Sequence, residues 1–125
     1  MIQIGQIWNV YVPFANEPES GKFRPAAIVG WSKFGLHQDE LIWVVPITAH
    51  SDGGTSLIGE VLIEKFQNFG LPRKSWVRPR ALYAVDKRIF PKDQPTLGTL
   101  DLNIMIEIYE EMGRMNHSNN EIVVL

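Results

Sequence analysis

The sequence predicts a mainly β domain, a small and strongly bent barrel followed by one helix. Short runs rich in β-branched and aromatic residues follow one another, separated by stretches of Gly, Pro, Asn, Asp and Ser. Only one stretch, near the C-terminal end, has the three- and four-residue spacing of a helix. Consecutive short strands that are too few for a sandwich favour a barrel.

The first half of the chain supplies three of the expected strands. "QIWNVYV" (6–12) is predicted to be a strand, and the proline-containing "PFANEPESGK" (13–22) is expected to form a long loop. "PAAIVGW" (25–31) and "ELIWVVPIT" (40–48) are nearly continuous apolar runs. Such runs are typical of central strands that are covered on both faces.

The next segment predicts two further strands and an irregular link. "SLIGEVLI" (56–63) is a strand candidate, and residues 64–74 join it to "SWVRPRALYAV" (75–85). In an extended chain, alternation directs one set of the 75–85 side chains inward and directs Trp76, Arg78 and Arg80 outward. Pro79 has no N–H for a ladder hydrogen bond, which predicts an edge strand or a bulge at this point.

A helix is predicted at about 101–115, with the Asp101 carboxylate as its N-cap. Its polar stripe is narrow, and nearly all the remaining positions are apolar. A single surface helix needs a smaller apolar arc than this. The helix is therefore expected either to sink deeply into the domain or to pack on a second subunit as well. "EIVVL" (121–125) is predicted to add a short terminal strand.

Composition limits the function classes. The 125 residues are expected to form a single domain (1–125), and the absence of cysteine excludes a disulfide framework. No signal peptide or apolar span of membrane length is recognisable, so a cytoplasmic location without a membrane partner is expected. The net charge is −2, but residues 71–92 hold seven of the twelve bases and one acid, which gives this segment +6 and the rest −8. The basic segment is either a solvated edge or an anion-binding surface.

Three residues are candidates for catalysis, and each also has an ordinary structural interpretation. Arg24 is held extended by Pro25, and its planar guanidinium suits a phosphate; it is otherwise a surface residue. Thr48 ends an apolar strand, where its hydroxyl either caps a turn or donates to a phosphate oxygen. His50 has the side chain that titrates near neutrality and is a candidate proton acceptor or a plain loop residue.

Five residues are candidates for binding nucleic acid. Trp76, Arg78 and Arg80 are predicted to form a platform on which a base stacks while the arginines hold the backbone, or else a plain amphipathic strand edge. Lys22 and Lys74 are counted with them. No metal site is predicted, because the three histidines are far apart and no ligand-spacing motif is present.

Three blocks in this order resemble the MazF/PemK family of toxin endoribonucleases. They are "GQIWNVYVPF…GKFRPAAIVG", "VVPITAH" and "SWVRPRALYAVDKRIF…LGTLD", and together they span about residues 5–112. The resemblance implies a small SH3-like barrel with a C-terminal helix that forms a homodimer. It also implies metal-independent, sequence-selective cleavage of single-stranded RNA without a cofactor, and an antitoxin protein that occludes the site.

By position, the resemblance assigns catalysis to Arg24 and Thr48, and Arg78 falls where some members have a second functional arginine. Those members have an aspartate two residues later, where this chain has Arg80, and a histidine in the first loop, which this chain lacks. The chain therefore fits the branch that relies on the Arg–Thr pair. Two alternatives remain: a toxin of the related CcdB group that binds DNA gyrase without catalysis, and an RNA-binding relative without activity.

Overall fold

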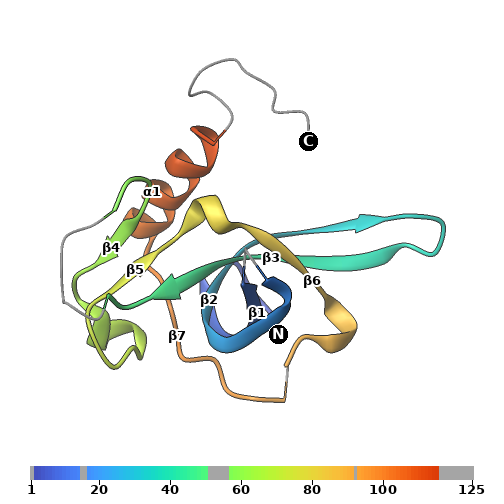
Figure 1. The fold of residues 1–125 in the computed structure, drawn as a ribbon, viewed down its shortest axis with the longest axis horizontal. Helices are drawn as coiled ribbons and strands as arrows, with labels where there is room; N and C mark the ends of the chain where they lie inside the picture. The colour runs from blue at the N-terminus through green and yellow to red at the C-terminus, as the bar shows by residue number, and fades with distance from the viewer. Residues whose placement is uncertain (1, 15–16, 51–56, 92, 116–125) are drawn as a thin grey trace.

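The central feature of the fold is a strongly curled antiparallel sheet with a helix packed beside it (Figure 1). The structure is a computed structural model that describes residues 2–14, 17–50, 57–91 and 93–115. Within these ranges the sheet has seven strands in the order β4-β5-β3-β2-β1-β7, and β6 also pairs with β3. The predicted class, mainly β with a C-terminal helix, is confirmed.

The elements have the following bounds. The strands are β1 Gln6–Phe14, β2 Glu17–Phe34, β3 Asp39–Thr48, β4 Val61–Ile63, β5 Ser75–Val77, β6 Tyr83–Asp86 and β7 Gly98–Thr99. Short 3-10 helices lie at Phe66–Phe69, Pro79–Ala81 and Lys87–Ile89, and the helix α1 is Leu102–Gly113. The predicted strands at 6–12 and 40–48 are confirmed, whereas residues 57–60 form a turn and β4 is shorter than predicted.

The long loop expected at 13–22 is wrong, because β2 begins at Glu17 and pairs with β1. Val12 lies opposite Lys22 and Pro13 opposite Gly21, and the register shifts after Pro13. A Cβ on Gly21 would lie 2.3 Å from the carbonyl oxygen of Val12, so glycine permits this close approach. Proline and glycine therefore mark an irregular point in a hairpin here, which is a known use of both residues in strands.

The continuous strand expected at 75–85 is also wrong. β5 and β6 both pair with β3, with Val77 opposite Ile47 and Tyr83 opposite Val44. Between them Pro79 begins a 3-10 turn, and the N–H of Arg78 donates to the carbonyl of Pro46. The interruption thus lies at the proline, where the sequence placed an edge or a bulge.

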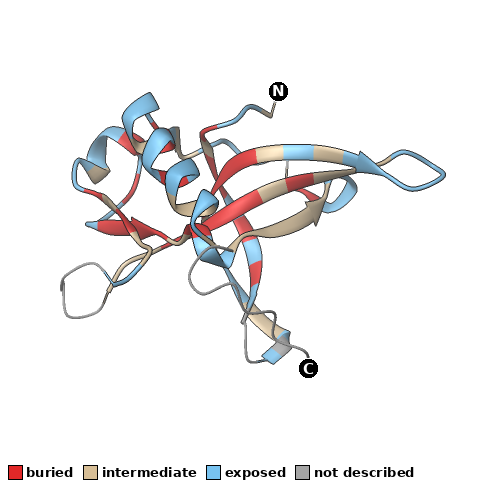
Figure 2. Cartoon of the chain, turned by 90° about the horizontal axis from the view of Figure 1, so that it is seen from above, coloured by how far each residue is buried: buried red, intermediate tan, exposed pale blue. Residues whose placement is uncertain are grey.

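Apolar residues cover both faces of the central strands, as their unbroken runs predict. One buried cluster, which includes Ile7, Val45 and Ile108, lies between the sheet and α1. A second cluster, which includes Trp8 and Val44, lies on the other face. Beyond these clusters the β2–β3 hairpin extends away from the rest, and its tip is exposed (Figure 2).

Helix α1 rests on the sheet but is not sunk into it. The Asp101 carboxylate accepts a hydrogen bond from the N–H of Ile104 at 3.0 Å, which confirms the predicted N-cap. Met105 and Ile108 are buried, whereas Leu102, Ile106 and Tyr109 are exposed. The structure therefore excludes the deeply sunk helix. The predicted strand at 121–125 lies outside the described residues. No helix in the described ranges is long and apolar enough to cross a bilayer.

Candidate active site

Arg24 and Thr48 line one cleft of about 340 Å³, although they come from different strands. The described pairing of β2 with β3 ends at Ala26 opposite Pro46. Arg24 and Thr48 each lie two residues beyond this last pair. Because side chains alternate along a strand, the two residues are expected on the same face of the parting strands. The cleft thus opens where β2 and β3 separate, and residues 71–73 and Ser75 line its other side.

The charge of this cleft is entirely positive. The charged residues that line it, as far as the structure describes the chain, are Lys22, Arg24 and Arg73. Asn9, Thr48 and Ser75 add polar groups. Cations without a facing carboxylate favour an anionic ligand, and arginine suits a phosphate in particular.

The guanidinium of Arg24 has an unusual environment. Its Nε is buried and has no hydrogen-bond partner among the described residues. A buried donor without a partner costs about 1–3 kcal/mol of free energy. A ligand oxygen that accepts a hydrogen bond from the Arg24 Nε removes this cost. Tyr83 lies nearby: its hydroxyl donates to the carbonyl of Tyr11, next to Val10, which pairs with Arg24. Burial raises the pKa of Tyr83, against the opposing effect of the Arg24 charge, so the phenol stays protonated.

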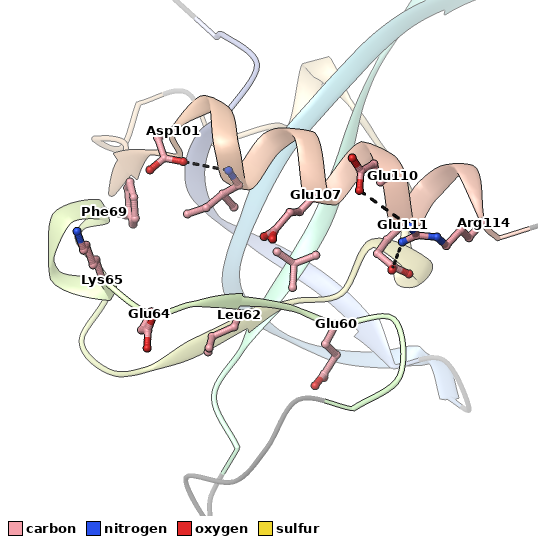
Figure 3. A pocket seen from close by; sticks show the side chains of 12 residues that line it. Glu60, Leu62, Glu64, Lys65, Phe69, Asp101, Glu107, Glu110, Glu111 and Arg114 are labelled. Carbon is pink, nitrogen blue, oxygen red and sulfur yellow. Dashed lines mark hydrogen bonds and ion pairs between the residues drawn. The ribbon is translucent and has the colours of Figure 1, made fainter.

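A larger groove, of about 540 Å³ between α1 and β4, has the opposite charge (Figure 3). Its acidic lining residues are Glu60, Glu64, Asp101, Glu107, Glu110 and Glu111. Lys65 and Arg114 are its basic lining residues, and Arg114 already pairs with Glu110 and Glu111. A polyanion is repelled here, so the smaller Arg24 cleft is the better candidate for an anionic substrate.

The structure contradicts the outward-facing Trp76 ring on which the predicted platform with Arg78 and Arg80 depends. Trp76 is 1% exposed, and the ring of His50 and the ammonium of Lys74 lie against its indole. Arg78 Nε lies 2.9 Å from Glu60 Oε2, and Arg80 Nη2 lies 3.5 Å from Glu111 Oε2. Neither arginine is among the residues that line the Arg24 cleft. Trp76 is part of the interior and both arginines are paired with carboxylates.

His50 belongs to the same paired network. Its Nε2 lies 2.8 Å from Glu60 Oε1, and its ring centroid is 4.4 Å from that of Trp76. His50 does not line the Arg24 cleft, so the arrangement favours a structural role for it. Lys74 lies above Trp76, with Nζ 5.5 Å from the ring centroid. Within the described ranges, no three His, Asp or Glu side chains are grouped so that they could hold a metal ion.

A protein-family model described as "PemK-like, MazF-like toxin of type II toxin-antitoxin system" matches residues 3–115. The chain belongs to this family. It is therefore a MazF-like toxin, and the fold that the sequence predicts for it agrees with solved structures of such toxins. Curated protein sequences contain no match to this toxin.

Three solved structures illustrate the shared fold. MazF from Deinococcus radiodurans is 17% identical to this toxin, over 91% of this chain and 94% of that chain, with a TM-score of 0.63. A MazE–MazF structure from the same organism is 14% identical over 93% and 95% of the two chains, with a TM-score of 0.59. The Mycobacterium tuberculosis toxin MazF-mt6 is 18% identical over 86% and 95%, with a TM-score of 0.56.

Sequence reasoning missed three groups that lie at or near the toxin's cleft. Phe23 was assigned to no role, although it lines the cleft beside Arg24. Arg73 was counted only as part of the basic segment 71–92, and Tyr83 only among the set of 75–85 side chains that alternation directs inward. The sequence signal that could have found Phe23 is an aromatic residue between two basic residues, Lys22 and Arg24.

Glu60 organises the network beside the cleft and allows a pH-dependent test. Its side chain is 5% exposed and accepts from His50, Arg78 and the N–H of Leu57. Burial acts to raise the pKa of Glu60, but these hydrogen bonds outweigh it and hold the pKa below its ordinary value of 4.5. The charged carboxylate therefore stabilises the fold above pH 4.5, and this contribution is lost as the pH falls through the lowered pKa.

We expect Glu60→Gln to lower the free energy of unfolding by about 1–3 kcal/mol at pH 7, because one buried acceptor of charged groups is lost. Urea unfolding at pH 7 and at pH 3.5 measures the effect, and the difference from wild type should shrink at the lower pH. Glu64→Gln, at an exposed position of the same segment, is the matched control with an expected change within about 0.5 kcal/mol. Equal losses at both pH values would contradict the assigned role of the Glu60 charge.

Proposed function

We propose that this toxin is a metal-independent endoribonuclease that cleaves single-stranded RNA at selected sequences. The observation that carries the proposal is the meeting of Arg24 and Thr48 in a cationic cleft, with an unpartnered donor on Arg24. These are the two residues to which the family resemblance assigns catalysis. The opposite charge of the α1–β4 groove supports the same choice of site.

The proposed reaction is an internal transfer within the RNA. The ribose 2′-oxygen forms a bond to the adjacent phosphorus and loses its proton, while the bond from phosphorus to the 5′-oxygen breaks. The 5′-oxygen gains a proton, which leaves a 2′,3′-cyclic phosphate and a 5′-hydroxyl. Negative charge builds up on the non-bridging oxygens in the transition state. Arg24 stabilises this charge and Thr48 donates a hydrogen bond to it, as preorganised donors do in other enzymes.

Two protein partners complete the proposal: an antitoxin and a second copy of this chain. MazE–MazF complexes among the structural neighbours support the antitoxin. The second copy is supported by the exposed side chains of Leu102, Ile106 and Tyr109 on α1. Exposed Ile4 extends this apolar face. Its neighbour Gly5 donates its N–H to the carbonyl of Ile28, and Tyr109 of α1 donates its hydroxyl to the carbonyl of Val29, so both segments lie against the same stretch of β2. An apolar face of this kind is a typical subunit interface.

The decisive experiment incubates the purified chain with a long single-stranded RNA in excess EDTA and maps the fragment ends. Discrete cuts are expected, with 5′-hydroxyl ends that polynucleotide kinase labels directly. A 2′-deoxy nucleotide 5′ to the cut phosphate should block cleavage there, because the nucleophile is missing. Binding without cleavage would point to the inactive relative, and inhibition of DNA gyrase without RNA binding would point to the non-catalytic toxin.

A further inference from the structure

We propose that Phe23, supported by Tyr11, is a platform on which one nucleobase of the RNA substrate stacks. This inference rests on the proposed function, because it names the part of the site that holds a base. The sequence assigned stacking to Trp76, but that side chain is buried, with 1% exposed. Phe23 is 67% exposed and Tyr11 is 45% exposed.

The two rings form a built feature of the β1–β2 ladder. Tyr11 lies directly opposite Phe23 in the register, and the ring centroids are 5.7 Å apart with an interplanar angle of 72°. In such an edge-to-face pair one ring uses one face and the other uses an edge. Flat aromatic surface therefore remains open to a further partner. Leaving it in water forgoes the hydrophobic free energy that its burial would release.

The position of Phe23 connects this surface to the cleft. Phe23 lines the cleft together with Arg24 and Thr48, and Lys22 precedes it in the chain. Residues 22–25 of β2 lie beyond the described pairing with β3, so this edge of the strand is open. Alternation directs Phe23 and Arg24 to opposite faces of β2. Phe23 thus lines the cleft from the face of β2 opposite to that of Arg24. The stacked base is therefore assigned to a nucleotide next to the phosphate that Arg24 contacts.

The charge around the platform favours a nucleic acid over a protein segment. Lys22, Arg24 and Arg73, which line the cleft, can each bind a phosphate. Proteins that bind single-stranded nucleic acid combine such a cationic groove with aromatic side chains that stack on bases. Every base has a π-face, so stacking adds affinity at this position. The identity of the base is then left to polar groups of the cleft such as Asn9 and Ser75.

The test uses the full chain and a short single-stranded RNA that contains a mapped cut site, with a 2′-deoxy nucleotide that prevents cleavage. We expect Phe23→Leu to weaken binding about 5- to 150-fold, the range for loss of one stacked base. Phe23→Trp should bind at least as well as wild type. Phe34→Leu is the matched control, because Phe34 is 54% exposed at the distal end of the same strand, and its affinity should be unchanged.

Abasic substitution at each nucleotide provides the sharper readout. One position should exist at which removal of the base weakens wild-type binding strongly and weakens Phe23→Leu binding no further, since the two changes remove the same contact. The same position should also show the loss in kcat/KM when an RNA with a cleavable ribose is used. Circular dichroism of each variant checks that the exposed substitution leaves the fold intact.

The possible failures are distinguishable. If wild type binds and cleaves RNA while Phe23→Leu does both equally well, the platform is wrong and the proposed function stands. If wild type neither binds nor cleaves RNA, both proposals are wrong. If Phe23→Leu keeps its RNA affinity but loses binding to the antitoxin, the aromatic pair is a protein-docking surface and the inference is overturned.

Discussion

Replacing Arg24 with alanine is expected to reduce the rate of RNA cleavage about 100- to 1,000-fold, the usual effect of removing one preorganised transition-state donor. Alanine can neither offset the charge on the phosphorus-bound oxygens nor donate from the position of the buried Nε. Single-turnover cleavage of a labelled single-stranded RNA measures the loss. Arg24→Lys should recover part of the activity, since it restores a charge without the planar fork.

The same substitution should leave the stability of the fold nearly unchanged. Arg24→Ala removes a buried donor that has no described partner, which is favourable, and removes the packing of the aliphatic stem, which is not. We expect these terms to offset, with a change in unfolding free energy within about 1 kcal/mol. Arg88→Ala, at an exposed arginine paired with Asp86, is the control and should cleave normally. Full activity of Arg24→Ala would exclude the assigned site.

The parts of the site that the sequence predicted depend on local rules. Pro25 restricts the backbone of Arg24, and the apolar run before Thr48 marks the end of a strand, so both positions could be placed at strand ends. That the two strands are neighbours follows from the order of consecutive strands. The sequence and the family resemblance together could therefore predict that Arg24 and Thr48 lie close to each other.

The parts that failed depend on contacts between distant segments. The alternation in 75–85 cannot reveal that the ring of His50, from the end of another strand, lies against Trp76, whose side chain is buried. Glu60 was overlooked because its partners His50 and Arg78 are 10 and 18 residues away in the chain. Phe23 was overlooked because the prolines before it indicated a loop, whereas the β1–β2 ladder continues through this segment.

Replacing Ile106 with lysine is expected to convert the proposed homodimer into monomers at micromolar concentration. Ile106 is 46% exposed in the middle of α1, between exposed Leu102 and Tyr109. Burial of such a side chain contributes about 1.5–3 kcal/mol, and a two-fold axis places the substitution in the interface twice. Analytical ultracentrifugation of the purified chain measures the change in mass.

The control is Ile89→Lys, because Ile89 is 76% exposed on the 3-10 helix after β6 and outside the α1 face. It should remain a dimer, and both variants should keep their circular dichroism, since neither side chain belongs to a buried cluster. Met105 and Ile108 already attach α1 to the sheet, so the exposed apolar side chains are not needed to hold the helix. These side chains are therefore free to contact a second copy of the chain. A wild type that sediments as a monomer, or an Ile106→Lys variant that stays dimeric, would show that this face has another partner.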